Sequence, residues 1–79
     1  MGTLKPFETK CWIKFLQANG WSFSGRIKGS HHQYTKKGAI RSIPVWEAKK
    51  EIPGFHIQTG CRTIGTTTKI ARQWAKDNC

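Results

Sequence analysis

The stretch Arg26–Tyr34, with the sequence RIKGSHHQY, decides more about this chain than any other segment of similar length. Two adjacent histidines follow a Gly-Ser pair, with cationic residues upstream and a tyrosine downstream. Histidine is the side chain best suited to exchange protons near neutral pH, and lysine and arginine are suited to bind phosphate. Gly29 interrupts two strand-like segments. The stretch therefore predicts two neighbouring strands that carry proton-transfer groups on a phosphate-binding surface, or an ordinary strand with polar side chains in water.

A helix is expected before this stretch, from Phe7 to Asn19. Pro6 suits its first turn and Gly20 suits the residue just after its end. Four apolar residues recur at helical spacing and predict one buried face; they are Cys11, Trp12, Phe15 and Leu16.

Three strands are expected after Gly20, over residues 21–27, 30–35 and 39–45. Trp21, Phe23 and Ile27 share one parity, which is typical of a half-buried strand. The sequence Lys36-Lys37-Gly38 indicates a hairpin turn between the second strand and the third, and Pro44 places the third strand at an edge or near its end.

The connection over residues 46–66 is the hardest part to interpret. Phe55-His56-Ile57-Gln58-Thr59 alternates, which leaves room for an additional short strand before the last helix. That helix is expected over 67–77, capped by Thr66 or Thr67, with Ile70, Ala71 and Trp74 as its buried stripe. Two helices packed on one face of an antiparallel sheet would bury both stripes. We therefore expect an α+β fold in one domain, residues 1–79.

The charge of the chain points to a polyanionic partner. Its 79 residues contain fourteen Lys and Arg against four Asp and Glu, a net charge of +10. Such a field favours nucleic acid, whose phosphates supply most of the binding energy. A domain this small has a modest core, so a catalytic site is expected on a surface or in a shallow groove.

Apolar segments and cysteines indicate the compartment. No apolar run approaches the length of a spanning helix, and no signal-peptide pattern follows Met1; we expect a cytoplasmic protein without membrane contact. Cys11, Cys61 and Cys79 are odd in number and widely spaced. Their spacing predicts neither a disulfide framework nor a zinc site, with Cys11 in the core and Cys79 incidental.

Several segments together resemble the HicA toxins, the small ribonucleases of HicAB toxin–antitoxin modules. Leu16–Trp21 resembles the helix end and the Gly-Trp entry to the first strand, Arg26–Tyr34 resembles the family's KGSHH segment, and Ile43-Pro44-Val45 resembles the end of its third strand. The close resemblance covers residues 9–46. The final helix matches more loosely, and the 46–66 connection is longer than is usual in the family.

This resemblance implies a fold like that of double-stranded-RNA-binding domains, in the order helix–three-stranded antiparallel sheet–helix. It also implies that a histidine of the motif cleaves mRNA, and that a HicB-like antitoxin covers the site. His31 takes the position of the motif's first histidine and is the main catalytic candidate on that basis. His32 is the other candidate. Adjacent strand residues point to opposite faces, and periodicity alone leaves open which histidine faces RNA.

The residues around the histidines form a predicted RNA-binding set. Its cations are suited to hold the scissile phosphate, its glycine allows close backbone approach or forms a bulge, and its serine donates to phosphate or satisfies the turn. The set comprises Arg26, Lys28, Gly29, Ser30, Tyr34, Lys36, Lys37 and Arg41. The histidine spacing predicts no metal site, and no small-molecule cofactor is expected.

Aromatic residues have two interpretations, stacking on unpaired bases or packing in the core. Tyr34, Trp46 and Phe55 are candidates for stacking, although core packing is the preferred interpretation of Phe55. The tryptophans at positions 12, 21 and 74 are assigned to the core. His56 lies outside the motif and is given no role.

Three functions follow, from different classes. The leading hypothesis is a metal-independent endoribonuclease, the toxin of a type II toxin–antitoxin module, in which a strand histidine acts as general acid or base. The second is a non-catalytic RNA-binding module of the same fold. The third is an interaction protein whose basic face binds an acidic partner.

Overall fold

The computed structural model describes residues 6–79. Within this range no helix combines the length and apolar character needed to cross a membrane. The described part contains three helices and five strands, in an α+β arrangement with one three-stranded antiparallel sheet. In chain order they are β1 (Phe7–Glu8), α1 (Thr9–Ala18), β2 (Ser22–Lys28), β3 (His31–Thr35), β4 (Ile43–Val45), β5 (Glu51–Ile52), α2 (Gly54–Ile64) and α3 (Thr68–Asn78).

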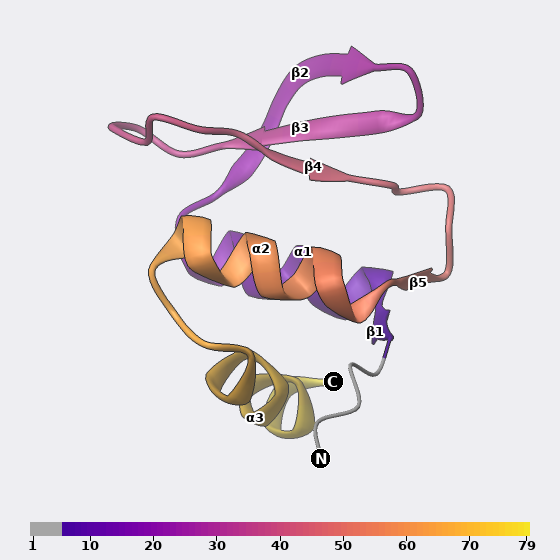
Figure 1. The fold of residues 1–79 in the computed structure, drawn as a ribbon, viewed down its shortest axis with the longest axis vertical. Helices are drawn as coiled ribbons and strands as arrows, with labels where there is room; N and C mark the ends of the chain where they lie inside the picture. Colours follow the sequence, from indigo (N-terminus) through magenta and orange to yellow (C-terminus); the bar gives the residue numbers. More distant parts are fainter. Residues whose placement is uncertain (1–5) are drawn as a thin grey trace.

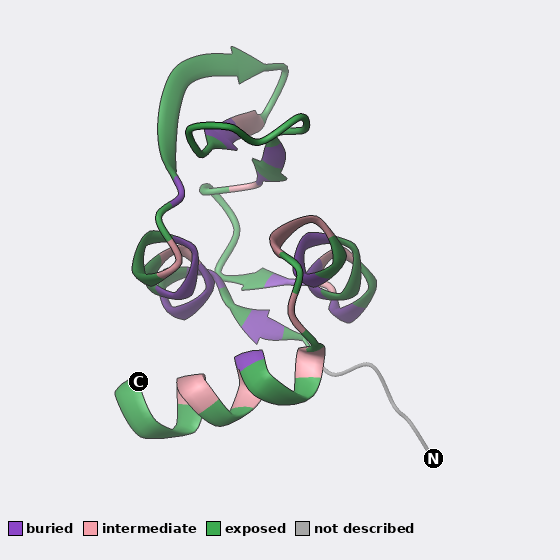
Figure 2. Cartoon of the chain, turned by 90° about the vertical axis from the view of Figure 1, so that its left-hand side faces the viewer, coloured by how far each residue is buried: buried purple, intermediate pink, exposed green. Residues whose placement is uncertain are grey.

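These elements form three layers. The β2-β3-β4 sheet lies on one side of the pair α1 and α2, which run side by side, and α3 lies on the other side of that pair (Figures 1 and 2). As predicted, two helices lie side by side on one side of the sheet, and these helices are α1 and α2. The partner of α1 in this layer is α2, whereas the sequence pattern assigned that place to the last helix.

Helix α1 confirms the first predicted element and its apolar face. The four predicted face residues, Cys11, Trp12, Phe15 and Leu16, are buried. The helix begins two residues later than expected because Phe7 and Glu8 form β1, which pairs with β5. It ends at Ala18 and is capped by Asn19, whose side-chain amide donates to the Phe15 carbonyl at 2.8 Å.

The hairpin β2–β3 confirms the predicted interruption at Gly29. Lys28 pairs with His31, so Gly29 and Ser30 form a two-residue turn. Gly29 has φ +59°, and positive φ at the first central residue alone is the signature of a type II′ hairpin turn. The third strand is shorter than predicted: it begins at Ile43, and residues 39–42 belong to the preceding loop.

Strand β2 is exposed along its whole length (Figure 2). The parity that predicted a half-buried strand holds for Trp21, which is 3% exposed, but Phe23 and Ile27 are 42% and 55% exposed. Two causes are visible. The strand lies at the edge of the sheet farthest from the helices, and its register shifts between Phe23 and Ile27, around Gly25 with φ +88°.

Helix α2 overturns the prediction of a short strand at 55–59. Its buried residues include Ile57, Gly60 and Cys61, which recur at helical spacing. Gly60 brings α2 against α1, because a Cβ at this position would lie 2.5 Å from Cζ2 of Trp12. The core interpretation of Phe55 is also wrong, since its side chain is 58% exposed.

Helix α3 confirms the last predicted element. The Thr67 hydroxyl caps it by accepting from the Ile70 amide at 3.2 Å. Ala71 is buried and Trp74 packs against the core, as predicted, whereas Ile70 is 56% exposed.

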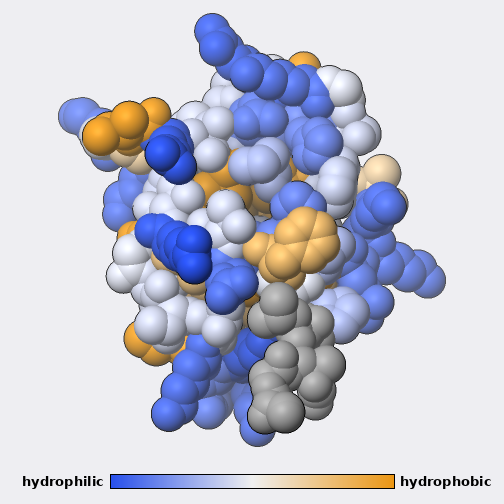
Figure 3. Space-filling model, viewed as in Figure 1, coloured by the Kyte–Doolittle hydropathy of each residue, from blue (hydrophilic) through white to orange (hydrophobic). Residues whose placement is uncertain are grey.

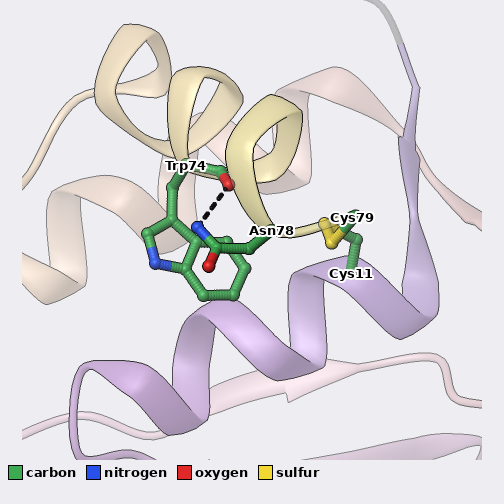
Figure 4. Close-up of a disulfide and its surroundings, with 4 residues drawn as sticks. All are labelled: Cys11, Trp74, Asn78 and Cys79. Carbon is green, nitrogen blue, oxygen red and sulfur yellow. Dashed lines mark hydrogen bonds between the residues drawn. A yellow bond between two sulfur atoms is a disulfide. The ribbon is translucent and has the colours of Figure 1, made fainter.

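A disulfide joins Cys11 to Cys79, which the cysteine spacing did not predict. It links α1 to the residue after α3, with the Asn78 amide donating to the Trp74 carbonyl beside it at 2.9 Å (Figure 4). The two cysteines are 68 positions apart, and only the packing of α3 on α1 brings their Cα atoms to 6.1 Å. Cys61 stays free, and burial raises the pKa of its thiol to about 11.

Candidate active site

The two motif histidines lie on opposite faces of β3. Directly paired residues on antiparallel strands point to the same face, and His32 pairs with Ile27 and Val45. We call this side the His32 face; it carries Ile27, His32, Tyr34, Ile43 and Val45. Tyr34, Ile43 and Val45 are buried, so the His32 face is the core side of the sheet.

The opposite side is the His31 face, which carries Lys28, His31, Gln33, Pro44 and Trp46. Lys28 pairs with His31 on one flank. On the other flank the His31 and Trp46 rings are stacked at a tilt, with centroids 4.4 Å apart. His31 is half-buried between a cation and an indole.

Helix α2 extends this arrangement with a third histidine. The His56 ring meets Trp46 edge-on at 4.7 Å, and Phe55 lies 4.4 Å beyond it. His31, Trp46, His56 and Phe55 therefore form an aromatic row that runs from the sheet to α2. Local sequence held no signal for this row, because His31 and His56 both reach Trp46 only when α2 packs beside β4.

The row borders a small groove between β4 and α2. The groove has a volume of about 120 Å³ and is lined by residues that include Arg41, Pro44, His56 and Thr59. Burial lowers the pKa of His56, and the positive charge of His31 lowers it further. His56 is thus biased toward the neutral imidazole, which can accept a proton.

His32 has different surroundings. Its ring contacts Phe23 with centroids 5.0 Å apart. Its Nδ1 atom is buried and has no hydrogen-bond partner among residues 6–79. One of its two ring nitrogens is therefore closed to substrate, whereas no such restriction is found for His31.

Tyr34 belongs to the core, which corrects its prediction as a stacking residue. The side chain is 4% exposed, and its hydroxyl donates to Oε2 of Glu47 at 2.6 Å. Burial raises the pKa of Tyr34, as do this hydrogen bond and the charge of Glu47. Because the Tyr34 ring is buried, Trp46 and Phe55 are the remaining candidates for stacking on a base.

The predicted cations divide into two groups along β3. Lys28 and Arg41 lie beside the aromatic row, and Lys49 lies 5.4 Å above the Trp46 ring. Lys36 and Lys37 occupy the turn at the other end of β3, about 16 Å from His31 for five strand residues. The remaining predicted residues are all exposed near the first hairpin: Arg26 in the irregular part of β2, and Gly29 and Ser30 in the turn.

The face of the molecule seen in Figure 3 is mostly hydrophilic, with separate apolar patches. Among residues 6–79, no three His, Cys, Asp or Glu side chains are grouped to hold a metal ion. The polar groups along the row and its groove include imidazoles, cations, and the side chains of Ser42, Thr59 and Thr63.

Comparison with known proteins identifies the family. The family model for the HicA toxin of bacterial toxin–antitoxin systems matches residues 12–66. This range extends past the resemblance over 9–46, includes the 46–66 connection, and ends before α3. It already contains the order helix–three strands–helix, so α2 closes the family fold and α3 follows it. No curated protein and no solved structure matches the chain. With more than half of its residues inside the family model, the chain belongs to the HicA toxins, proteins that are paired with an antitoxin.

Proposed function

We propose that this toxin is an endoribonuclease that binds single-stranded mRNA and cleaves it on the His31 face, without a metal ion. One observation carries the proposal: His31 lies on the face of β3 opposite the buried Tyr34, between Lys28 and the stacked ring of Trp46. A proton-transfer group, a phosphate-binding cation and a base-stacking ring are thereby placed next to one another.

RNA binding would depend on charge and stacking. Lys28, Arg41 and Lys49 surround the aromatic row and are suited to neutralise phosphates. Trp46 and the exposed Phe55 supply rings on which unpaired bases stack, each worth about 1–3 kcal/mol. Such contacts need splayed bases, so a single strand is the favoured substrate.

The chemistry requires proton transfer at two oxygens. Cleavage begins when the ribose 2′-oxygen attacks the adjacent phosphorus, and it ends when the 5′-oxygen leaves with a proton. An imidazole titrates near neutral pH and can serve either step. The cations beside it stabilise the additional negative charge on the phosphoryl oxygens in the transition state.

The partner and compartment follow from the substrate. We infer that a HicB-like antitoxin silences the toxin by covering the His31 face, and that the toxin acts in the cytoplasm, where mRNA is found. That compartment keeps most thiols reduced. The Cys11–Cys79 bond joins α1 to the end of α3 (Figure 4), and α3 lies on the far side of the helical pair from the sheet (Figure 1), so we expect cleavage to persist when the bond is reduced.

The test is RNA cleavage by purified protein in EDTA, alongside the variants His31→Ala and His32→Ala. We expect His31→Ala to lose about 10²- to 10⁴-fold in cleavage rate while it retains RNA binding, and His32→Ala to lose less. Intact RNA with tight, salt-sensitive binding by the unmodified protein would overturn the proposal. That result would favour a non-catalytic RNA-binding module, for which the same cations and rings would suffice.

A further inference from the structure

We propose that His56 is the second catalytic histidine of this site, acting as general base on the ribose 2′-hydroxyl while His31 acts as general acid on the 5′-oxygen. This inference rests on the proposed endoribonuclease function and assigns roles within the same site.

The geometry of the aromatic row supports this pairing. Both imidazoles contact the same indole, His31 at 4.4 Å and His56 at 4.7 Å between ring centroids. They approach it from different elements, β3 and α2. In-line displacement at phosphorus places the attacking and leaving oxygens on opposite sides. Two proton-transfer groups separated by one indole are suited to serve those two sides.

The surroundings of His56 favour a base. Its ring lies between Trp46 and Phe55, and burial and the charge of His31 lower its pKa. The cations near it are His31 from β3, Arg41 from the loop before β4, and Lys49 beyond Trp46. Of these, the charge of His31 lowers the pKa of His56 and so favours the neutral imidazole.

Two carboxylates, Glu47 and Glu51, precede α2 in the chain. Glu47 accepts the hydrogen bond from the buried Tyr34 hydroxyl, and Glu51 lies in β5, where it pairs with Glu8. Lys28 lies beside His31, where it is suited to hold the phosphoryl oxygens during the transfer.

The proposed reaction proceeds in one balanced step. The neutral imidazole of His56 takes the proton of the 2′-hydroxyl as the 2′-oxygen bonds to phosphorus. The bond from phosphorus to the 5′-oxygen breaks, and protonated His31 gives its proton to that oxygen. The products are a 2′,3′-cyclic phosphate and a free 5′-hydroxyl, and the two histidines exchange protonation states.

The first test measures cleavage rate against pH for the unmodified protein and for His31→Ala, His56→Ala and Gln58→Ala. Gln58 is an exposed neighbour on α2 outside the aromatic row, so its variant is the matched control. We expect a bell-shaped profile for the unmodified protein and the control. His56→Ala should lose about 10²- to 10⁴-fold in rate together with the acidic limb, because the base must be deprotonated. His31→Ala should lose the alkaline limb.

The second test replaces the 5′-bridging oxygen of the substrate with sulfur, a leaving group that needs no proton. This substrate should restore cleavage by His31→Ala and should not restore cleavage by His56→Ala. Restoration of His56→Ala instead would overturn the assignment of the base. If His56→Ala fails to fold, His56→Gln preserves the side-chain volume and is measured in its place.

The outcomes separate this inference from the proposed function. An unmodified protein that cleaves RNA, with His56→Ala showing the same rate and both limbs, overturns the role of His56 and leaves the ribonuclease intact. An unmodified protein that binds RNA without cleaving it overturns both.

Discussion

The His31 face and the His32 face of β3 begin from the same residue type at adjacent positions and end in opposite environments. On the His32 face, Tyr34, Ile43 and Val45 are buried against the helices. On the His31 face, the neighbours are Lys28 and Trp46, and α2 adds His56. The pleat of one strand thus gives the two motif histidines different surroundings. The difference teaches that adjacent motif histidines need not share one role, and each face can be tested separately.

The largest effect is expected from Ile43→Ala, which removes a buried side chain from the His32 face. A buried Ile→Ala substitution costs about 2–5 kcal/mol, and Ile43 is 3% exposed. The neighbouring Pro44→Ala, on the His31 face, should change the free energy of unfolding by less than about 1 kcal/mol. Urea denaturation measures both. Similar losses for the two variants would contradict the assignment of the faces.

Trp46→Ala should weaken RNA binding more than it lowers the stability of the fold, the opposite of what is expected for Ile43→Ala. Loss of a stacking ring costs about 1–3 kcal/mol of RNA binding, about 5- to 150-fold in Kd, and Trp46 is only partly buried. Fluorescence anisotropy with a short single-stranded RNA measures the Kd. Trp46→Phe is the matched control, because it keeps a ring and should retain most of the affinity. An unchanged Kd for Trp46→Ala would contradict the prediction that Trp46 stacks on an RNA base.

Tyr34→Phe tests the hydrogen bond that ties the His32 face to Glu47. A hydrogen bond to a charged group contributes about 1.5 kcal/mol or more, and the Tyr34–Glu47 bond is 2.6 Å long. The folded state raises the pKa of Tyr34 above its ordinary value of about 10. The folded protein therefore holds the phenolic proton more tightly than the unfolded chain does. This stabilisation is present below pH 10 and is lost as the pH rises above it.

Denaturation between pH 8 and pH 12 measures this contribution. The unmodified protein should lose stability above pH 10, and Tyr34→Phe should show a smaller loss in that range. Equal alkaline slopes would show that the Tyr34 hydroxyl is as free to ionise in the folded protein as in the unfolded one.

The smallest effect is expected from Lys28→Ala, as a change in salt dependence. Each phosphate contact to a single strand contributes about 0.7 to the slope of log K against log salt concentration. Lys28→Ala should reduce the slope by about that amount. Lys69→Ala removes an exposed cation from α3, on the far side of the helical pair, and should leave it unchanged. Equal reductions would mean that RNA does not distinguish the His31 face from the rest of the basic surface.

Local sequence predicted the elements whose signals are complete within a few residues. Helix α1 has a full apolar stripe, the β2–β3 hairpin has a glycine at the one position that needs positive φ, and α3 has a threonine cap. Helix α2 was missed because Phe55 and Ile57 imitate a strand. Its true buried face includes Gly60, a residue that carries no hydrophobic signal and is buried only because Trp12 lies against it.

Some residues of the candidate site could likewise be predicted from local sequence, and others could not. The motif pointed to His31, and the pairing of His31 with Lys28 follows from the two-residue turn between them. The disulfide, the burial of Tyr34 and the approach of His56 to Trp46 depend on contacts between distant segments. A prediction that uses only a few neighbouring residues at a time has no information about contacts between distant segments. The prediction that alternate residues of β2 are buried was wrong for a related reason. Burial of an edge strand depends on whether the helices extend far enough to cover it, and Phe23 and Ile27 are exposed.

The contact between Gly60 and Trp12 has a consequence for how this protein tolerates change. Gly60 lies one helical turn after His56, on a helix whose seating against α1 leaves no room for a methyl group. A side chain at position 60 would have to displace the buried Trp12 ring or shift α2, the helix that carries His56. The position of the His56 imidazole therefore depends on how closely α1 and α2 pack in the interior. Substitutions that displace this imidazole can lie at buried positions, away from the surface of the candidate site.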